Sequence, residues 1–323
     1  MSIPSFTDPV ADNGYRWWYL DAVSDDDLHA ITVIFFIGSV FSPYYARARK
    51  RNMTPAANHC AVNVALYGAP WRWCMTERTH HSVATSQKKL GIGKSGLTIN
   101  EAQNQLVVDI NEIATPWPSR VRGQLTVELP NYDLDPLALD ADDAANAAHF
   151  WQPVAPQTRI QVSFDKPALS WQGNAYVDSN YGDVPLESSF KSWIWSRSHS
   201  PDNSTRILYD VIDQDGHSRQ RSLRYSEHGE VSDFNAAQQH ELAKTRYWRI
   251  PRPARTAEGV DIDRLQTLED TPFYSRSRFR ENTDGQAGVT VHESLYLERF
   301  DTPWVRSLLP FRMPRRTRPL LSE

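Results

Sequence analysis

Two short motifs in this sequence combine groups that could transfer a proton with aromatic side chains. The first pairs His149 with Trp151, and the second pairs Tyr176 with Asp178, each with a single residue between. Side chains at i and i+2 of an extended segment point to the same face, so each motif presents its two side chains together. If the two segments pair, an acid, an imidazole and two aromatic rings converge in one pocket, where general acid–base chemistry becomes feasible.

The same residues also fit a purely structural role. Trp151 and Tyr176 could fill a core, as aromatic residues on strands usually do. His149 could be a hydrogen-bonded polar residue, and Asp178 could cap a turn at residues 180–182. Residue type and spacing alone leave both interpretations open.

The sequence lacks the motifs of the common cofactor and metal chemistries. No G-x-G-x-x-G, G-x-x-x-x-G-K-[ST], G-x-S-x-G or H-E-x-x-H pattern occurs, so no nucleotide cradle or metalloprotease site is predicted. The adjacent His80 and His81 would point to opposite faces of a strand and cannot readily share a metal. The acidic residues between Asp133 and Asp143 lack the spacing of a calcium loop and are predicted to form a solvated surface loop. We therefore expect no organic cofactor and no metal.

Composition restricts the class of protein further. The 323 residues carry 35 Lys and Arg against 39 Asp and Glu, a formal net charge of −4, which argues against a nucleic-acid partner. The longest apolar stretch, residues 31–41, is too short to span a bilayer as a helix. The first residues have neither the basic nor the apolar region of a signal peptide, so we expect a cytoplasmic protein.

The two cysteines, Cys60 and Cys74, exclude a disulfide scaffold and a four-cysteine zinc module. If residues 71–79 pair back on residues 58–68, Cys74 lies near Ala65 rather than near Cys60. Both thiols are then expected to be free and to act as small core residues.

Alternation of apolar and polar residues with period two is the dominant pattern along the chain. Val121, Leu125 and Val127, for example, alternate with polar residues, which predicts a half-buried strand of an antiparallel sheet. Helical signals are few, and Ser42-Pro43 and Thr302-Pro303 each open a short helical turn. The pattern predicts an all-β sandwich or barrel with few short helices. Further runs with strand character are residues 15–21, 29–38, 62–66, 71–79, 105–110, 160–164, 206–213, 221–225, 247–250 and 289–300.

A weak internal echo indicates two similar domains. Trp17-Trp18-Tyr19, a polar turn and the apolar residues 31–37 resemble Trp193-Ile194-Trp195, a polar turn and residues 207–212. Each set is typical of an aromatic strand, a turn and an apolar strand near the start of a domain. We predict an N-terminal β-domain of residues 1–188 and a C-terminal β-domain of residues 189–323.

Five blocks of low degeneracy stand out along the chain. They are Gly14–Ala22, Phe36–Tyr45, His59–Tyr67, Met75–Arg78 and Leu309–Arg315. In these blocks, and in their order, the sequence resembles the carotenoid 1,2-hydratases (hydroxyneurosporene synthases) of carotenoid-producing bacteria. The resemblance runs through nearly the whole chain, which makes it more specific than a single short motif.

The resemblance implies an enzyme that adds water to the isolated terminal double bond of an acyclic carotene and forms a tertiary alcohol without a cofactor. It also implies an architecture of two lipocalin-like antiparallel β-barrel domains, in agreement with the strand pattern and the internal echo. The residues proposed for catalysis in that family are a His-x-Trp pair and a Tyr-x-Asp pair. They fall here on His149, Trp151, Tyr176 and Asp178, so the N-terminal domain would carry the site.

The chemistry of this reaction suggests a role for each of the four residues. An electron-rich alkene must be protonated before water can add, so the site needs an acid and stabilisation of a cation. Asp178 is expected to donate the proton, with a pKa raised from about 4 by burial among aromatic rings. Trp151 and Tyr176 are expected to bind the substrate and to stabilise the cation with their π faces. His149 is expected either to hold Asp178 in its productive form or to take the proton from the attacking water.

The C-terminal segment 304–318 suggests contact with a membrane surface. Basic residues interleaved with apolar ones suit an anionic bilayer, where a carotene substrate resides. We therefore expect peripheral contact with the inner, photosynthetic membrane, the alternative being that the segment docks on the protein's own carboxylates. The segment contains no acid and five arginines, namely Arg306, Arg312, Arg315, Arg316 and Arg318.

Two other functions stay open. A non-catalytic lipocalin-like carrier of hydrophobic ligands would need only the fold. A hydratase or isomerase of another prenyl substrate would pass through the same cation. Product analysis separates the three, since a carrier gives no turnover and an isomerase only shifts a double bond.

Overall fold

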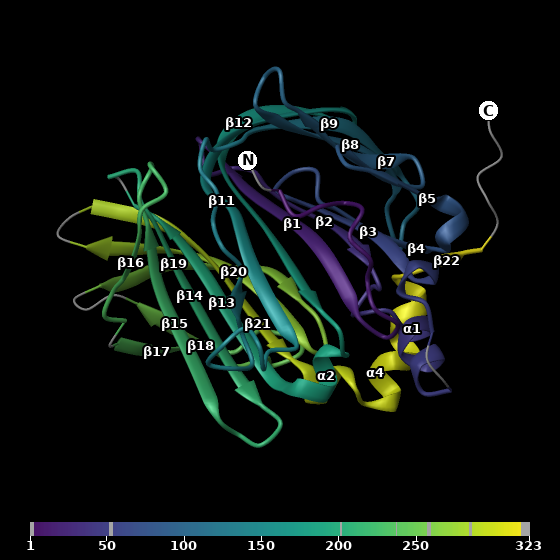
Figure 1. Cartoon of the computed structure of the whole chain (residues 1–323). Coiled ribbons are helices and arrows are strands. Elements are labelled where there is room, and N and C mark those ends of the chain that lie inside the picture. The colour runs from purple at the N-terminus through teal and green to yellow at the C-terminus, as the bar shows by residue number, and fades with distance from the viewer. Residues whose placement is uncertain are drawn as a thin grey trace. The chain divides into compact units, whose positions relative to one another are not determined.

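The structure, a computed structural model, describes residues 3–51, 54–200, 202–236, 238–256, 260–283 and 286–317. Within these ranges antiparallel strands dominate and the α-helices are short (Figure 1). The predicted all-β class with few short helices is confirmed.

Contacts divide the chain into two compact units. The first comprises Met1–Pro185 with Ser307–Glu323, and the second comprises Leu186–Arg306. The domain boundary predicted from the sequence follows residue 188, with residues 189–323 in the second domain. The terminal segment departs from that assignment because β22 pairs in parallel with β4 of the first unit.

Most elements are strands of about five to ten residues, as is usual for an antiparallel sheet. The strands of the first unit are β1 (Tyr15–Ser24), β2 (Ala30–Ile37), β3 (Cys60–Tyr67), β4 (Arg72–Arg78), β5 (Val83–Ser86), β6 (Lys89–Ile92), β7 (Ser95–Asn100), β8 (Gln105–Ile113), β9 (Arg120–Glu128), β10 (Leu137–Ala138), β11 (His149–Lys166), β12 (Ala168–Gly182) and β22 (Arg315–Arg316). Those of the second unit are β13 (Phe190–His199), β14 (Thr205–Asp213), β15 (Ser218–Tyr225), β16 (Val231–Asp233), β17 (Gln238–Leu242), β18 (Arg252–Thr256), β19 (Asp261–Asp270), β20 (Tyr274–Thr283) and β21 (Gln286–Tyr296). The helices are α1 (Pro43–Arg49), α2 (Leu186–Ser189), α3 (Leu297–Phe300) and α4 (Pro303–Leu308).

The first unit is built on one curled, lipocalin-like sheet. Its strand order is β22-β4-β3-β2-β1-β12-β11-β9-β8-β7-β6-β5, with β10 paired to β11. The curl brings β7, β8 and β9 over β1, β2 and β3 (Figure 1). Apolar residues from both halves of the sheet therefore meet on its inner side.

The inner side of this sheet is a packed apolar core. Phe35, Val64, Val108, Leu125 and Val162 are fully buried there, each on a different strand. A cavity between Phe6, Trp18, Phe35, Leu106 and neighbouring side chains has a volume of about 10 Å³. That volume holds about one water molecule. Side chains thus fill the interior around this cavity.

The opposite face of the same sheet is also buried around β1. Trp18 and Leu20 belong to the apolar core, so the alternate residues of β1 point away from it. Among these, Tyr15, Tyr19 and Asp21 are 1%, 7% and 0% exposed. A strand that is buried on both faces usually carries apolar residues on both. The second face of β1 instead carries hydroxyl and carboxyl groups.

The second unit holds a sheet with the order β16-β15-β14-β13-β21-β20-β19 and a separate ladder of β17 and β18. Its first strand, β13, lies between β14 and β21, just as β1 lies between β2 and β12 in the first unit. The two stretches of the internal echo are therefore equivalent hairpins, β1–β2 and β13–β14. This agrees with the expectation of two similar domains, which stays a prediction.

Local signals in the sequence were accurate at several positions. The side chain of Ser42 caps α1 by accepting hydrogen bonds from the backbone N–H groups of Tyr44 and Tyr45, at 3.1 and 2.9 Å. Cys74 lies opposite Val64, one residue from the expected position, and both cysteines are free and buried as predicted.

Two predicted strands are wrong in whole or in part. Residues 247–250 form a turn and its exit, because the carboxylate of Asp270 accepts hydrogen bonds from the backbone N–H groups of Tyr247 and Trp248. Residues 297–300 form α3 instead of extending β21. Leu297 and Phe300, three residues apart, are both buried there by the helical turn.

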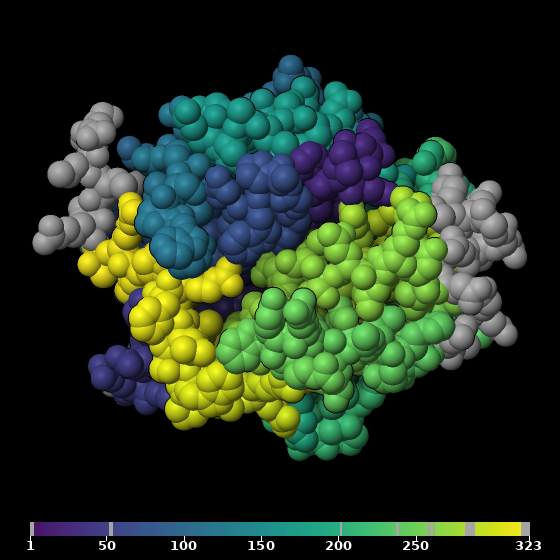
Figure 2. Space-filling view, turned by 180° about the vertical axis from the view of Figure 1, so that it is seen from behind, coloured from purple at the N-terminus to yellow at the C-terminus, as the bar shows by residue number. Residues whose placement is uncertain are grey.

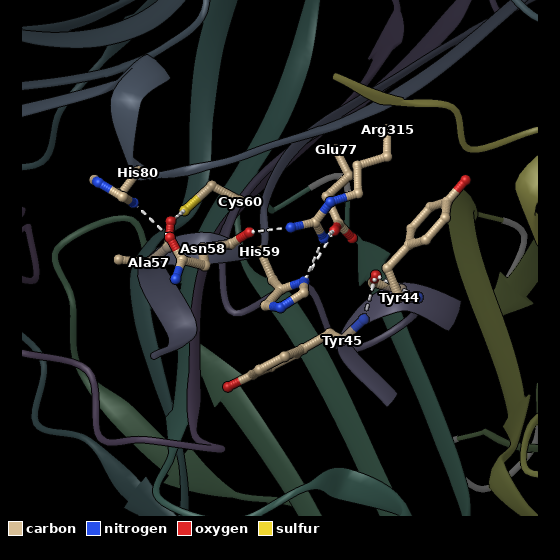
Figure 3. A network of polar contacts seen from close by, with 10 residues as sticks. Tyr44, Tyr45, Ala57, Asn58, His59, Cys60, Glu77, His80 and Arg315 are labelled. Carbon is tan, nitrogen blue, oxygen red and sulfur yellow. Dashed lines mark hydrogen bonds and ion pairs between the residues drawn. The ribbon is translucent and has the colours of Figure 1, made fainter. Parts of the chain in front are cut away.

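The terminal segment is held by a buried carboxylate (Figure 3). The guanidinium group of Arg315 pairs with Glu77 and donates a hydrogen bond to the carbonyl of Asn58 at 3.0 Å. Glu77 also contacts Nδ1 of His59 at 2.9 Å, and the imidazole stacks on the ring of Tyr45. Since the side chain of Glu77 is 0% exposed, Arg315 supplies the countercharge that a buried carboxylate requires.

Candidate active site

The two motifs singled out in the sequence lie on neighbouring strands, β11 and β12. The strands pair antiparallel, with His149 opposite Gly182, Trp151 opposite Asn180 and Pro153 opposite Asp178. The register shifts just beyond, between Pro153 and Thr158, where β11 bulges. A bulge turns the strand locally and often occurs beside functional sites.

Trp151, Tyr176 and Asp178 form one hydrogen-bonded cluster. The indole N–H of Trp151 donates to Oδ2 of Asp178 at 2.9 Å and lies 3.0 Å from the hydroxyl of Tyr176. The hydroxyl of Tyr176 donates to the same Oδ2 at 2.7 Å. Trp151 and Tyr176 are 0% exposed and Asp178 is 4% exposed. Because Oδ2 receives both donors, a proton carried by Asp178 belongs on Oδ1.

The structural alternative for Asp178, capping of a turn, is wrong. Residues 180–182 continue β12 as regular strand and pair with both β1 and β11. The carboxyl group of Asp178 points instead to the face that carries Tyr176. A carboxyl group is rarely buried to this extent, so the cluster that it forms with two aromatic side chains is a candidate functional site.

His149 lies at the other end of this row of side chains. It stands opposite Gly182, four residues from Asp178 along β12, which is about 13 Å at the rise of a strand. Its Nδ1 is 2.9 Å from the hydroxyl of Tyr15, and the two rings stack. Burial lowers the pKa of His149 to about 4, against an opposing effect of Asp140. Burial also raises the pKa of Tyr15 well above its ordinary value. Both groups are therefore neutral at pH 7.

Gly182 is required at this point by close approach rather than by its backbone angles. A Cβ atom there would lie 2.7 Å from Nδ1 of His149, 2.8 Å from the carbonyl oxygen of Ala148 and 2.9 Å from the ring of Tyr15. The backbone of Gly182 thus lets the Tyr15–His149 pair form across β12. Asp140 fixes the start of β11 by accepting hydrogen bonds from the backbone N–H groups of Ala148 and His149.

Strand β1 contributes residues to the site that the sequence analysis did not assign. Tyr15 bonds His149, Trp17 stacks on Tyr15 with ring centroids 4.9 Å apart, and Tyr19 packs edge-on against Tyr176. Asp21 stands directly opposite Tyr176. The period-two alternation of residues 15–21 was the available signal, since it places these four side chains on one face.

A cluster of metal-ligand type in the described part of the chain lies elsewhere, at Asp213, Asp215 and His217. It occupies the exposed turn between β14 and β15, where Asp213 accepts hydrogen bonds from the backbone N–H groups of the other two residues. These hydrogen bonds account for the cluster as turn chemistry. The expectation that no metal is needed stays a prediction.

The buried imidazoles predict a loss of stability in mild acid. Folded His149 has a pKa of about 4, below its ordinary 6.5, so between these values the unfolded chain binds a proton that the folded chain does not. The free energy of unfolding should therefore fall as the pH drops from 6.5 to 4, by about 3 kcal/mol for this residue. His292 in the second unit, with a pKa lowered to about 3 by burial, acts in the same direction.

Urea unfolding at pH 7.0 and 5.0 measures this effect. A folded His149→Gln variant should lose less stability between the two pH values than the parent chain. The exposed His217 is the matched control, and His217→Gln should keep the parent's dependence. An identical dependence in His149→Gln would show that this imidazole is not the group that titrates.

The fold and the site together define a class: a lipocalin-like all-β protein with a buried cluster of one carboxyl group and aromatic side chains on a sheet face. Comparison with known proteins makes the class specific. The family model described as carotenoid hydratase CrtC matches residues 33–321. The chain belongs to the carotenoid hydratase CrtC family.

Curated relatives cover most of the chain. Acyclic carotenoid 1,2-hydratase of Thiocapsa roseopersicina is 45% identical over 97% of this chain and 76% of its own length. The protein of the same name from Rubrivivax gelatinosus is 43% identical with the same coverage. That of Cereibacter sphaeroides is 33% identical over 88% of this chain and 98% of its own.

Solved structures share the fold at low sequence identity. An AttH-type protein of Nitrosomonas europaea aligns with a TM-score of 0.60 at 12% identity, over 87% of this chain and 91% of its own. The structure of CghA with Sch210972 aligns with a TM-score of 0.57 at 12% identity, over 91% and 94% of the two chains. At this identity the similarity concerns the fold alone.

Proposed function

We propose that this protein is a hydro-lyase that adds water to the terminal double bond of acyclic carotenes of the neurosporene or lycopene type, giving 1-hydroxy carotenoids. The observation that carries the proposal is the buried cluster in which Trp151 and Tyr176 both bond Oδ2 of Asp178. Its relatives at 43–45% identity are named acyclic carotenoid 1,2-hydratases. The cluster supplies the acid and the aromatic surface that such a reaction needs.

The first step is transfer of a proton from Asp178 to the less substituted carbon of the alkene. Hydrogen bonds from Trp151 and Tyr176 hold Oδ2, so Oδ1 carries the proton toward the substrate. The proton forms a new C–H bond with the π electrons and leaves a tertiary cation and an Asp178 carboxylate. Trp151 and Tyr176 stabilise the cation with their π faces, which is worth about 2 kcal/mol in a site without water.

The second step is capture of the cation by water. Water forms the C–O bond to the cation and passes one proton to a base of the site, which gives the tertiary alcohol. His149 is neutral and bonded to Tyr15, so we assign it a positioning role at the end of the site rather than direct support of Asp178. All these steps use side chains and water, and the proposal includes independence of any cofactor.

Expression in a carotene-accumulating bacterium, followed by mass analysis of the pigments, tests the function. The proposal expects carotenoids heavier than the precursor by one water molecule. Unchanged pigment that co-purifies with the protein would instead indicate a carrier of hydrophobic ligands. A shifted double bond without a gain in mass would indicate an isomerase.

We further propose that the protein meets its substrate at a membrane surface, through exposed aromatic residues of the first unit. Trp71, Trp117 and Phe311 are 45%, 84% and 77% exposed. Their loops are joined, since Thr115 bonds the carbonyls of Trp73 and Arg312. Exposed Trp and Phe side chains partition into the lipid interface.

The basic part of the terminal segment is less available for lipids than the sequence suggested. Arg306 pairs with Glu187 and Asp301, and Arg315 pairs with Glu77. Arg318 lies outside the described residues. The C-terminal part of the chain forms part of the surface in Figure 2, in yellow. In the described residues no helix is long and apolar enough to cross a bilayer. Arg316 is exposed, so contact with lipid would combine its charge with exposed apolar side chains such as Phe311.

Flotation with vesicles that contain anionic lipid tests the membrane proposal. The double variant Trp117→Ser, Phe311→Ser should bind several-fold less than the parent, because each exposed aromatic side chain contributes apolar area to the lipid contact. Leu28→Ser is the matched control, since Leu28 is 68% exposed in the turn after β1. Equal flotation of the double variant and the parent would contradict the proposal.

A further inference from the structure

Asp21 is a buried carboxyl group in the middle of a strand. It lies on β1, which is flanked by β12 and β2, and stands opposite Tyr176 on one side and Thr32 on the other. Its side chain is 0% exposed. Asp is depleted in strands and is rarely buried to this extent. The burial of this carboxyl group in the middle of a strand therefore needs a functional or structural explanation.

The register places Asp21 next to the acid site. Tyr176 and Asp178 occupy successive positions on the same face of β12, and Asp21 is opposite the first and diagonal to the second. Diagonal neighbours in an antiparallel pair have Cα atoms about 7–8 Å apart. Two residues with carboxyl groups are thus neighbours of Tyr176 on this face, and the hydroxyl of Tyr176 donates to one of them, Asp178.

The hydration needs a proton acceptor as well as a donor. Once Asp178 has protonated the alkene, the water that attacks the cation must lose a proton to a base. If Asp178 itself were that base, its carboxylate would have to accept the proton of the attacking water while it can also take back the proton of the cation, which reverses the first step. A second carboxylate on the same face gives the water proton an acceptor of its own, so that capture of the cation does not depend on the Asp178 carboxylate.

We propose that Asp21 is the base that takes the proton from the attacking water, an assignment that rests on the hydratase function proposed above. Water forms the C–O bond to the cation while one of its O–H bonds breaks, and that proton forms an O–H bond with the Asp21 carboxylate. The proton then passes from Asp21 to Asp178, which restores both groups. The sum of the steps is alkene plus water to alcohol.

Turnover in deuterium oxide separates the two carboxyl groups. Asp178 exchanges its proton for deuterium, so reversible protonation labels the recovered carotene even when no water adds. In Asp21→Asn the hydrated product should fall by about 100-fold or more, while labelling of recovered carotene persists. In Asp178→Asn both should be lost.

Each outcome decides the assignment. Hydration within about threefold of the parent in folded Asp21→Asn overturns it. Loss of hydration and labelling together would place Asp21 in the protonation step and overturn it as well. If the parent chain gives neither product nor label, the hydratase function itself fails, which is a different result from either of these.

Two further variants guard against a structural effect. Asp109 is an exposed strand carboxylate bonded to Gln124, and Asp109→Asn should behave as the parent. If Asp21→Asn does not fold, as judged by circular dichroism, Asp21→Glu keeps the charge and displaces it by one methylene. The ratio of hydrated to labelled carotene should then fall severalfold, and an unchanged ratio contradicts the proposal.

Discussion

Asp178→Asn should lower the rate of carotene hydration by about 10⁴-fold or more. General acid catalysis typically contributes about 10²–10⁴-fold, and an isolated alkene has no easier route to the cation. Asn keeps the size of the side chain and can accept the hydrogen bonds from Trp151 and Tyr176 that Oδ2 accepts in the parent. It has no transferable proton. The measurement is hydrated product per folded enzyme.

Neighbouring substitutions set the scale for this effect. Asp183→Asn is the matched control, because Asp183 is exposed directly after β12 and only five residues away. Tyr176→Phe should be milder than Asp178→Asn, since the π face remains and one donor to Asp178 is lost. His149→Ala should fall between these two, because it removes the partner of Tyr15. A well-folded Asp178→Asn that keeps most of its activity would show that the proton comes from another group.

Arg315→Met should lower the free energy of unfolding of the first unit by about 3 kcal/mol. Removing one partner of a buried ion pair usually costs about 3–5 kcal/mol, because the remaining charge stays buried without compensation. We expect the lower end because the side chain of Arg315 is 20% exposed while that of Glu77 is 0% exposed. The substitution also removes a hydrogen bond to the carbonyl of Asn58.

The adjacent residue provides the control for this experiment. Arg316 lies on the same two-residue strand, β22, but is exposed, so Arg316→Met should change stability by less than about 0.5 kcal/mol. Thermal unfolding measures both variants, and about 3 kcal/mol corresponds to a decrease of roughly 6–12 °C for a unit of this size. Equal melting temperatures for the two variants would show that the Glu77 pair does not anchor the terminal segment.

Local sequence determined much of the secondary structure. Alternation with period two located β9 and parts of β3 and β11, because the pleat sends successive side chains to opposite faces. Runs of strand-forming residues located β1, β2, β4 and β8, whereas β5, β6, β7 and β16 to β20 carried no signal that was recognised. The Ser42 cap was also a local signal, since capping needs only the next three residues. Residues 247–250 were predicted wrongly because the carboxylate of Asp270, distant in sequence, holds them in a turn.

The candidate site was determined in part by the same local rule. Spacing by two put Tyr176 and Asp178 on one face of a strand, and likewise His149 and Trp151. It could not establish which strands are neighbours. Pairing of β11 with β12 brought Trp151 to Asp178, whereas the register placed His149 four residues away, beside Tyr15.

Only the tertiary structure decided which face of the first sheet is the core and what the other face carries. Alternation predicts that Trp17 and Trp18 point to opposite faces of the sheet. It does not say which of the two faces is turned to the core. The curl of the sheet decides this, because it buries Trp18 among the apolar residues of the inner side. Tyr15, Trp17, Tyr19 and Asp21 are left on the face of Asp178, because β1 pairs with β12, more than 140 residues later in the chain. Such long-range pairing depends on the loop closures and packing of the whole sheet, which no local pattern encodes.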